Sequence, residues 1–280
     1  MTVFKKIKKT RILGSMDMER KMIIETVKSF YQEVLNAHKN DRKTINKFMY
    51  TDFVQHIDGI PNGRDAFIAM TDRFFQLRPA IDILKIFTND NDEAAVFSRC
   101  TCEADNSVHK AVDIFGFRDG KLAEHWNVTE HNVEKTEVKS GRGLFSTDAP
   151  STPSPAIEMQ KDNTAKVIAF NEEIFNAHNN DKALLDDYMM DDYMQHNPSA
   201  GDGKEGFIGF TNFFFTLDPE MVISKTFANE EGEVAVYFKC VCKANGMINK
   251  VCDIYRLNDG KLAEHWDVVE HNIKDEPGIF

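Results

Sequence analysis

The sequence predicts an α+β protein made of two copies of one domain, and three observations lead to this class. The 280 residues are about twice the length of a common domain. The chain also aligns with itself at a shift of 140 positions, with no gap. Within each copy, helical spacing of apolar residues comes first and strand alternation follows. The helices are therefore expected to pack on one face of a curved antiparallel sheet.

Matched segments run through both copies and include most of the residues that could form a site. Every histidine except His109 has a histidine 140 positions away, and the two tryptophans pair in the same way. The clearest matches are Phe30–His38 with Phe170–His178, Gln55–His56 with Gln195–His196, and Asp119–Trp126 with Asp259–Trp266.

The repeat divides the chain into four parts. Residues 1–18 are predicted to form a basic N-terminal tail, 19–135 the first domain and 162–280 the second domain. Between the domains, residues 136–161 collect Ser, Thr, Gly and Pro, which is the composition of a linker. A flexible linker of this length allows the two domains to pack side by side.

The elements are clearest in the second copy. Apolar residues at 167, 170, 174 and 177 follow helical spacing after a cap at Asn163 or Thr164. Two more helices are predicted over 182–190 and 204–215, and strands over 234–242, 248–257 and 262–269. The last two strands flank an Asn-Asp-Gly sequence, which is a strong hairpin signal.

Charge and composition exclude several classes of function. The formal charge of −11 disfavours binding to nucleic acid and to anionic membranes, because both need clustered Lys and Arg. No segment approaches the roughly 20 apolar residues of a membrane helix, and no signal peptide is recognised, so a cytoplasmic location is expected. The five cysteines are an odd number without the spacing of a secreted disulfide framework.

Three residues of the last two strands are the strongest candidates for chemistry. His265 and Asp267 are two apart on one strand, so they project from the same face. A two-residue hairpin loop would set Asp253 opposite Trp266, whereas a three-residue loop with Gly260 as a bulge would set it opposite His265. We favour the bulged loop. Burial and like-charge repulsion are then expected to raise the pKa of one carboxylate toward neutrality, as a general base requires.

Simpler interpretations of the same residues stay open. The acids and His265 could form a polar strand face in which they satisfy one another. His196, which follows Gln195, could close a pocket from the other side or serve only as a structural hydrogen-bonding residue. Spacing typical of a metal site is absent, so no metal is predicted. The two Cys-x-Cys pairs at 100–102 and 240–242 lie on an apolar strand face and are interpreted as core.

The segment from Val251 to Val268, together with Gln195-His-Asn-Pro198 and Asp202-Gly-Lys-Glu-Gly206, resembles the SnoaL-like polyketide cyclase family of the nuclear transport factor 2-like superfamily. The resemblance covers both copies. It implies two cone-shaped α+β barrels in tandem, each with a pocket, and dimerisation through the sheet. A tandem chain could form that pair within itself as a pseudo-dimer, and further self-association stays open.

The resemblance also implies roles for single residues. The acid after the tryptophan, here Asp267, corresponds to the acid/base catalyst of a cofactor-independent aldol condensation, and Asp253 to a ligand-contacting position. His265 would orient or share the charge, and Gln195 or His196 would hydrogen-bond the enolate oxygen. The remaining predicted ligand contacts are Trp266 in the second copy and His56, Asp113 and His125 in the first.

The first copy departs from this pattern because Asn127 replaces the acid, and an amide cannot accept the proton that a base takes. Only the second pocket is therefore predicted to be catalytic, on a small hydrophobic carbonyl compound and without a cofactor. Two other functions stay open. One is a non-catalytic ligand-binding or dimerisation module, and the other is hydrolase, dehydratase or isomerase chemistry in the same pocket.

Overall fold

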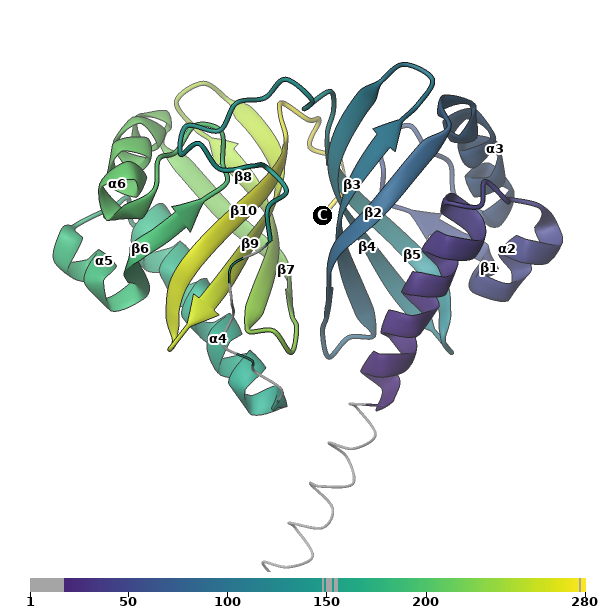
Figure 1. Ribbon diagram of the computed structural model, residues 1–280, viewed down its shortest axis with the longest axis horizontal. Helices are drawn as coiled ribbons and strands as arrows, with labels where there is room; N and C mark the ends of the chain where they lie inside the picture. Colours follow the sequence, from purple (N-terminus) through teal and green to yellow (C-terminus); the bar gives the residue numbers. More distant parts are fainter. Residues whose placement is uncertain (1–17, 148, 150–152, 154–155, 277) are drawn as a thin grey trace, which may run out of the picture.

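The computed structural model describes residues 18–147, 149, 153, 156–276 and 278–280. The predicted basic tail, apart from Met18, lies outside this part of the chain. Ten strands form one continuous sheet in the order β1-β5-β4-β3-β2-β7-β8-β9-β10-β6. Within this sheet, the strands of the two halves are paired at a single bridge, between Thr88 and Ala228. Each half carries its helices on its outer side, and the two halves of the sheet face each other across the middle of the molecule (Figure 1). This is the predicted α+β class in two copies.

The first half contains, in order, a first helix (18–30), η1 (Tyr31–Leu35), α2 (Arg42–Phe48), β1 (Met49–Gln55), α3 (Arg64–Phe74), η2 (Phe75–Leu77), β2 (Pro79–Thr88), β3 (Glu93–Cys102), β4 (Ser107–Arg118) and β5 (Lys121–Glu130). The second half contains α4 (Ile157–Phe170), η3 (Asn171–Asn176), α5 (Lys182–Tyr188), β6 (Met189–Gln195), α6 (Gly203–Phe214), η4 (Phe215–Leu217), β7 (Pro219–Ala228), β8 (Glu233–Cys242), β9 (Met247–Asn258) and β10 (Lys261–Glu270). Every strand of one half has its counterpart 140 positions away in the other, which confirms the tandem repeat.

Three sequence predictions need correction. The helix predicted to start near Asn163 begins at Ile157, inside the predicted linker, because its first turn also buries an apolar residue. Strand β6 was not predicted, and neither was β1. Each is a short run with two consecutive exposed residues, so it lacks clean alternation, and each gains its strand form by pairing parallel to β10 or β5.

The hairpin between β9 and β10 has a two-residue loop, not the three-residue loop we favoured. Asp259 and Gly260 both have positive φ, +48° and +74°, as the tight turn of a two-residue hairpin requires. A bulge then falls between Leu262 and Glu264, and it shifts the register by one residue. Asp253 therefore lies opposite Asp267, not opposite His265.

Each half has its own apolar core between helices and sheet, and a third core lies between the halves. The alternating face of β8 that includes Cys240 and Cys242 joins the core of the second half, and all five cysteines are free and buried. The core between the halves contains Trp126 and Trp266, with aliphatic and aromatic residues from both sheets. The face-to-face packing of the two sheets therefore excludes water from both tryptophans.

Two lysines extend this contact between the halves. Lys85 of β2 forms an ion pair with Glu233 of β8 and lies 4.4 Å from the centre of the Trp266 ring. Its counterpart Lys225 reaches back to Glu93 at 2.5 Å and lies 3.9 Å from the centre of the Trp126 ring. Each half thus places a cation against an acid and a tryptophan, which supplies charge pairing and a cation–π contact.

The segments that follow the two sheets cross to the opposite half. We call residues 131–147 the first crossing segment and residues 271–280 the second. Ser140 donates to the carbonyl of Gln195 in the second half at 2.6 Å, and the carbonyl of Gly278 accepts from His56 in the first half at 2.6 Å. The part of the predicted linker up to residue 147 is therefore packed in place and is not a free coil.

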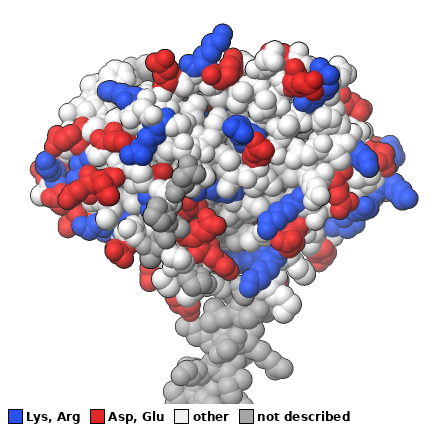
Figure 2. All heavy atoms as spheres, in the orientation of Figure 1, with Lys and Arg blue, Asp and Glu red and all other residues white. Residues whose placement is uncertain are grey.

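On the face that Figure 2 shows, acidic and basic side chains are interspersed. Among the described residues, no helix has both the length and the apolar character needed to cross a membrane.

Candidate functional site

The predicted acids and imidazole of the second half do meet on one face, inside the cone. In β10, His265 and Asp267 alternate with Trp266, which turns toward the other half. Because Asp253 lies opposite Asp267 on β9, its side chain projects from the same face. All three side chains are at least nine-tenths buried. The prediction of a shared face is confirmed, although the bulge after Leu262, not the loop, produces it.

His265 is held between an amide and a carboxylate. Its Nδ1 lies 2.9 Å from Oε1 of Gln195, at the end of β6. The same oxygen accepts the backbone N–H of Asn197 at 2.8 Å, so it is already oriented as an acceptor and favours a proton on Nδ1 of His265. On its other side, Nε2 lies 3.4 Å from Oδ1 of Asp253. That Nε2 has no hydrogen-bond partner among the described residues.

Tyr255 completes this group. Its ring stacks on the imidazole of His265 with centroids 4.7 Å apart, and its hydroxyl donates to Oδ2 of Asp253 at 3.0 Å. Burial and the nearby Asp253 raise the pKa of Tyr255 well above its ordinary value, so the phenol keeps its proton. The arrangement therefore holds a phenol that is hydrogen-bonded to Asp253 and stacked on the imidazole of His265.

Asp267 has partners from both halves. Its Oδ2 accepts from the side-chain amide of Asn197, and its Oδ1 lies 3.4 Å from Nζ of Lys110 in β4 of the first half. Burial works to raise the pKa of Asp267, but Lys110, His265 and Asn197 outweigh it and the pKa is lowered. The expectation that burial raises the pKa of one carboxylate of this group is therefore not met at Asp267, because Lys110 comes from outside the segments that sequence reasoning considered.

Lys110 itself is a residue that sequence reasoning missed. It is 1% exposed and also pairs with Glu130 at 3.0 Å. Burial works to lower its pKa, but Asp267 and Glu130 more than compensate, so the pKa is raised and the amine stays charged. The available signal was a lysine on the strand face that it shares with Val112 and Ile114, because a charge on an apolar face needs a buried partner.

The first half repeats the core of this arrangement with different neighbours. His125 contacts Oε1 of Gln55 through Nδ1 at 2.9 Å and Oδ1 of Asp113 through Nε2 at 3.0 Å. The phenol comes from a helix instead of a strand, because Tyr31 donates to Oδ2 of Asp113 at 2.7 Å. Asn127 replaces the second acid and lies near the hydroxyl of Thr129 at 3.3 Å.

His196 and Trp266, which were predicted to contact a ligand, lie on the other face of the sheet from His265. Their rings stack 4.8 Å apart. Nε2 of His196 meets Glu264 at 2.7 Å, and Nδ1 meets the carbonyl of Gly143 in the first crossing segment at 2.7 Å. The indole of Trp266 donates to the carbonyl of Ser146 at 2.9 Å. These residues fasten the crossing segment, and the structure does not bring them to the acids.

His56 and Trp126 form the matching group in the first half. Their rings stack 4.0 Å apart, and His56 lies between Glu124 at 2.8 Å and Gly278 of the second crossing segment. Glu264, the counterpart of Glu124 in the second half, has an additional partner in Arg256, and the first half has Gly116 at that position. Burial works to raise the pKa of Glu264, but His196 and Arg256 lower it overall. The pair of His196 and Glu264 is thus more buried and more fully charge-paired than the pair of His56 and Glu124.

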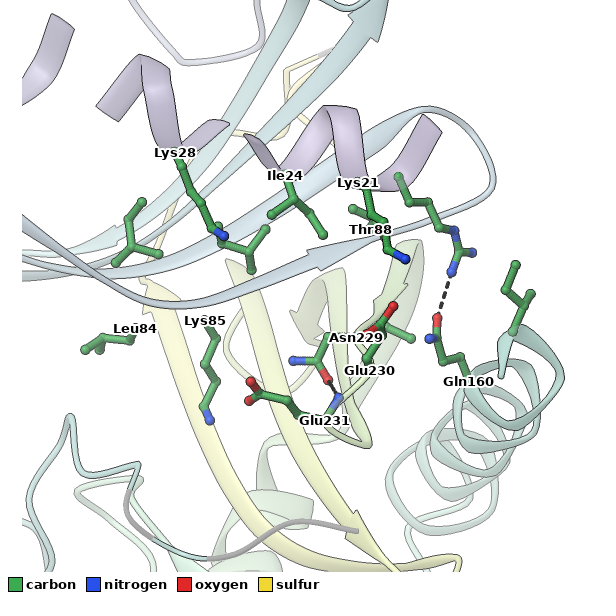
Figure 3. Close-up of a pocket in the computed structure, with 15 residues that line it drawn as sticks. Lys21, Ile24, Lys28, Leu84, Lys85, Thr88, Gln160, Asn229, Glu230 and Glu231 are labelled. Atoms are coloured by element: carbon green, nitrogen blue, oxygen red, sulfur yellow. Dashed lines mark hydrogen bonds between the residues drawn. The ribbon is translucent and has the colours of Figure 1, made fainter. Parts of the chain in front are cut away.

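The two cavities that flank the junction of β2 and β7 lie away from the acids and His265. Their volumes are about 410 and 420 Å³, and neither is lined by Asp253, His265 or Asp267 (Figure 3 shows the first). Within the described part of the chain, no group of three or more His, Cys, Asp or Glu side chains is arranged to hold a metal ion. Tyr255 packs against the group formed by Asp253 and His265 inside the second half.

The fold is that of a SnoaL-like protein. The model of the SnoaL-like domain matches the chain twice, over residues 27–125 and 167–265, so the chain belongs to this family. In particular, it is a tandem member, with one family domain in each half.

Several solved structures are similar to part of the chain. One, described as a putative SnoaL-like polyketide cyclase from Jannaschia sp. CCS1, is 21% identical and covers 39% of this chain and 86% of its own, with a TM-score of 0.35. Another, described as a putative polyketide cyclase from Bacillus cereus, is 17% identical and covers 39% and 74%, with a TM-score of 0.34. IdmH, described as a putative polyketide cyclase from Streptomyces antibioticus, is 18% identical and covers 39% and 91%, with a TM-score of 0.32. No curated protein matches the sequence.

Proposed function

We propose that the second domain binds a small carbonyl compound and transfers a proton on it without a cofactor, as an aldol condensation requires. The observation that supports this most directly is the buried Nε2 of His265, which has no hydrogen-bond partner among the described residues. In the first domain, the matching nitrogen of His125 is bonded to Asp113. An unpaired buried nitrogen costs stability, and a ligand hydroxyl or an acidic C–H group, which would donate to it, would satisfy it.

In this proposal, Asp253 and His265 act together as the base in place of Asp267. Because Oε1 of Gln195 accepts a hydrogen bond from Nδ1 of His265, Nε2 is the ring nitrogen that takes the substrate proton in this proposal. Once Nε2 has taken a proton from the carbon between two carbonyls, the carboxylate of Asp253 stabilises the imidazolium. Asp267 stays ionised beside Lys110 and contributes to the field around the site. His196 has no part in the chemistry, because its ring is engaged on the other face.

We also propose that the two halves act as a built-in pseudo-dimer. The shared core around both tryptophans and the exchanged crossing segments support this. Because Lys110 comes from the first half, the second site needs both halves to be complete.

Hydrogen–deuterium exchange at the central carbon of a β-dicarbonyl model compound tests the proposal. We expect His265→Gln and Asp253→Asn to lower the exchange rate above buffer by about 100-fold or more. The matched changes His125→Gln and Asp113→Asn in the first domain are expected to leave the rate within about twofold. Equal rates in the wild type and in the two second-domain variants would overturn the proposed chemistry.

A second candidate function is ligand binding without chemistry. It is favoured by the position of the two cavities, which lie at the junction and away from the acids. In that case ligand would bind while exchange stayed at the buffer rate in every variant.

A further inference from the structure

His109, the one histidine without a histidine counterpart in the other half, lies in β4 beside the point where the first crossing segment leaves the sheet. Its ring contacts His131 and Asn132, the first two residues of that segment. The matching residue of the second half is Asn249. The two halves therefore differ here by a side chain that can gain a proton at physiological pH and one that cannot.

The hydrogen bonds around His109 require one form of its ring. Its Nδ1 accepts the backbone N–H of Asn132 at 3.4 Å, so this nitrogen carries no proton. Its Nε2 therefore carries the proton and donates to Oγ of Ser107 at 3.0 Å, and that hydroxyl donates to Oδ1 of Asp105 at 2.7 Å. The hydroxyl and the backbone N–H of Ser107 lower the pKa of Asp105, which keeps it an acceptor. His109 is thus held as a neutral imidazole.

His131 depends on the same nitrogen of His109. Its Nδ1 lies 3.2 Å from Nδ1 of His109, so His131 supplies the proton in this contact. The two rings meet edge to face, with centroids 5.0 Å apart. A proton on Nδ1 of His109 would therefore remove the acceptor from both His131 and the backbone of Asn132, and it would set N–H groups against each other.

The charged and titratable groups around His109 act in both directions. Burial and the nearby His131 lower the pKa of His109, and they outweigh Asp105 and Glu134, which favour the protonated ring. Opposite His109 on β3, burial raises the pKa of the Cys100 thiol, so the thiol stays neutral. Because the folded pKa of His109 is lowered, the contact loses stability as the pH falls below the ordinary histidine value of about 6.5.

The contact of His109 holds the start of the first crossing segment in place. Directly after it, the N–H of Val133 donates to the carbonyl of Val108 at 2.8 Å. Val133 is buried in a small apolar cluster with Val138 and Leu144 of the same segment. Release of the first residues would therefore uncover the apolar cluster under a segment that also fastens the second half.

The second crossing segment makes the same backbone contacts with an acceptor that does not titrate. The N–H of Asn272 donates to Oδ1 of Asn249 at 3.1 Å, and the next N–H, of Ile273, donates to a β9 carbonyl at 2.8 Å. His271 is the counterpart of His131, so the two segments share this histidine and differ in the acceptor. The second half is thus a matched control within the same chain.

We propose that His109 is a pH-sensitive switch for the first crossing segment. At neutral pH the uncharged ring accepts from Asn132 and His131, and the start of the segment is closed. Acid protonates Nδ1, both hydrogen bonds are lost, and residues 131–134 open. The second crossing segment stays closed under the same conditions. The switch does not depend on the chemistry proposed for the second domain.

Hydrogen exchange of backbone amides in the full chain, followed by NMR from about pH 7.5 to about pH 5, tests the switch. Protection factors correct for the intrinsic pH dependence of exchange. We expect the protection of Asn132 and Val133 to fall by about threefold or more over this range, because the open form binds a proton on His109 more readily. The protection of Asn272 and Ile273 is expected to change by less than about twofold.

His109→Asn is the matched variant, because it installs the residue that accepts the same N–H in the second half. Its protection at Asn132 and Val133 is expected to stay within about twofold of the wild type at neutral pH and to lose the dependence on pH. His131→Asn removes only the neighbouring ring and is expected to weaken this dependence without abolishing it. Full pH dependence in His109→Asn would overturn the proposal, and so would an equal loss of protection at Asn132 and Asn272 in the wild type.

Discussion

The two interior sites share a carboxylate, an imidazole and an amide but differ in everything that surrounds them. Tyr31 of a helix supplies the phenol in the first site, whereas Tyr255 of a strand supplies it in the second. The counterparts of these two residues are Asn171 and Phe115. The phenol hydroxyl therefore comes from a different element in each half but donates to the matching aspartate. The hydrogen bond to the aspartate, and not the position of the tyrosine in the sequence, is what both copies retain.

The second site differs further by its extra acid and by its dependence on the other half. Asp267 and Asn197 replace Asn127 and Ile57, and the added charge is balanced by Lys110 of the first half. The contacts between the halves show the same imbalance. Lys85 and Glu233 are 5% and 2% exposed, whereas Lys225 and Glu93 are 17% and 11% exposed. The two halves therefore carry one more buried and one more open version of this ion pair.

The largest expected effect comes from breaking the more buried ion pair between the halves. Lys85→Met removes the ion-pair partner of the buried carboxylate of Glu233, which also accepts from Asn229, and we expect the free energy of unfolding to fall by about 3 kcal/mol. Lys225→Met at the more open pair should cost about half as much, because solvent reaches Glu93. Urea unfolding at pH 7 measures both.

A double change controls for the loss of the charge itself. Lys85→Met with Glu233→Gln should recover part of the lost stability, because no unpaired charge stays buried. Equal losses for Lys85→Met and Lys225→Met would contradict the inequality of the two pairs.

The second prediction concerns Asp267→Asn, which gives the second site the residue that the first site has at this position. The folded pKa of Asp267 lies below its unfolded value, so the carboxylate stabilises the fold above about pH 4, and this contribution is lost as the pH falls through the folded pKa. We expect the variant to lose about 2 kcal/mol at pH 7 and to differ less from the wild type below pH 4. Urea unfolding from pH 7 to pH 3 measures the change.

The pKa of Glu130 is shifted in the direction opposite to that of Asp267. Burial and the charge of Asp267 raise its pKa despite Lys110, so Asp267→Asn relieves that repulsion and limits the loss. The matched change Asn127→Asp adds an acid to the half in which Ile57 stands in place of Asn197, and it should destabilise more at pH 7 than at pH 3. A loss of stability in Asp267→Asn that does not change with pH would show that the charge of Asp267 does not stabilise the fold.

Sequence reasoning succeeded where the signal was local and failed where the partner was distant. The repeat, the order of helices and strands, and the shared face of Asp253, His265 and Asp267 follow from alternation within short segments. The bulge after Leu262 could not be foreseen, because two adjacent registers satisfy the same turn residues. The ion pair to Lys110 joins residues 157 positions apart, and no local pattern specifies which strands of the two halves meet.

The smallest expected effect tests whether the exchanged phenols are equivalent. Tyr31→Phe and Tyr255→Phe each remove one buried hydrogen bond to an aspartate and change no volume otherwise, so both should lower the free energy of unfolding by about 1 kcal/mol. Tyr50→Phe is the matched control, because its hydroxyl meets Asp119 at 3.3 Å in an exposed position and should cost less than about 0.5 kcal/mol. Urea unfolding of the three variants decides the matter. If Tyr31→Phe is indistinguishable from Tyr50→Phe while Tyr255→Phe is costly, the helix-borne hydroxyl has lost the role that the strand-borne one keeps.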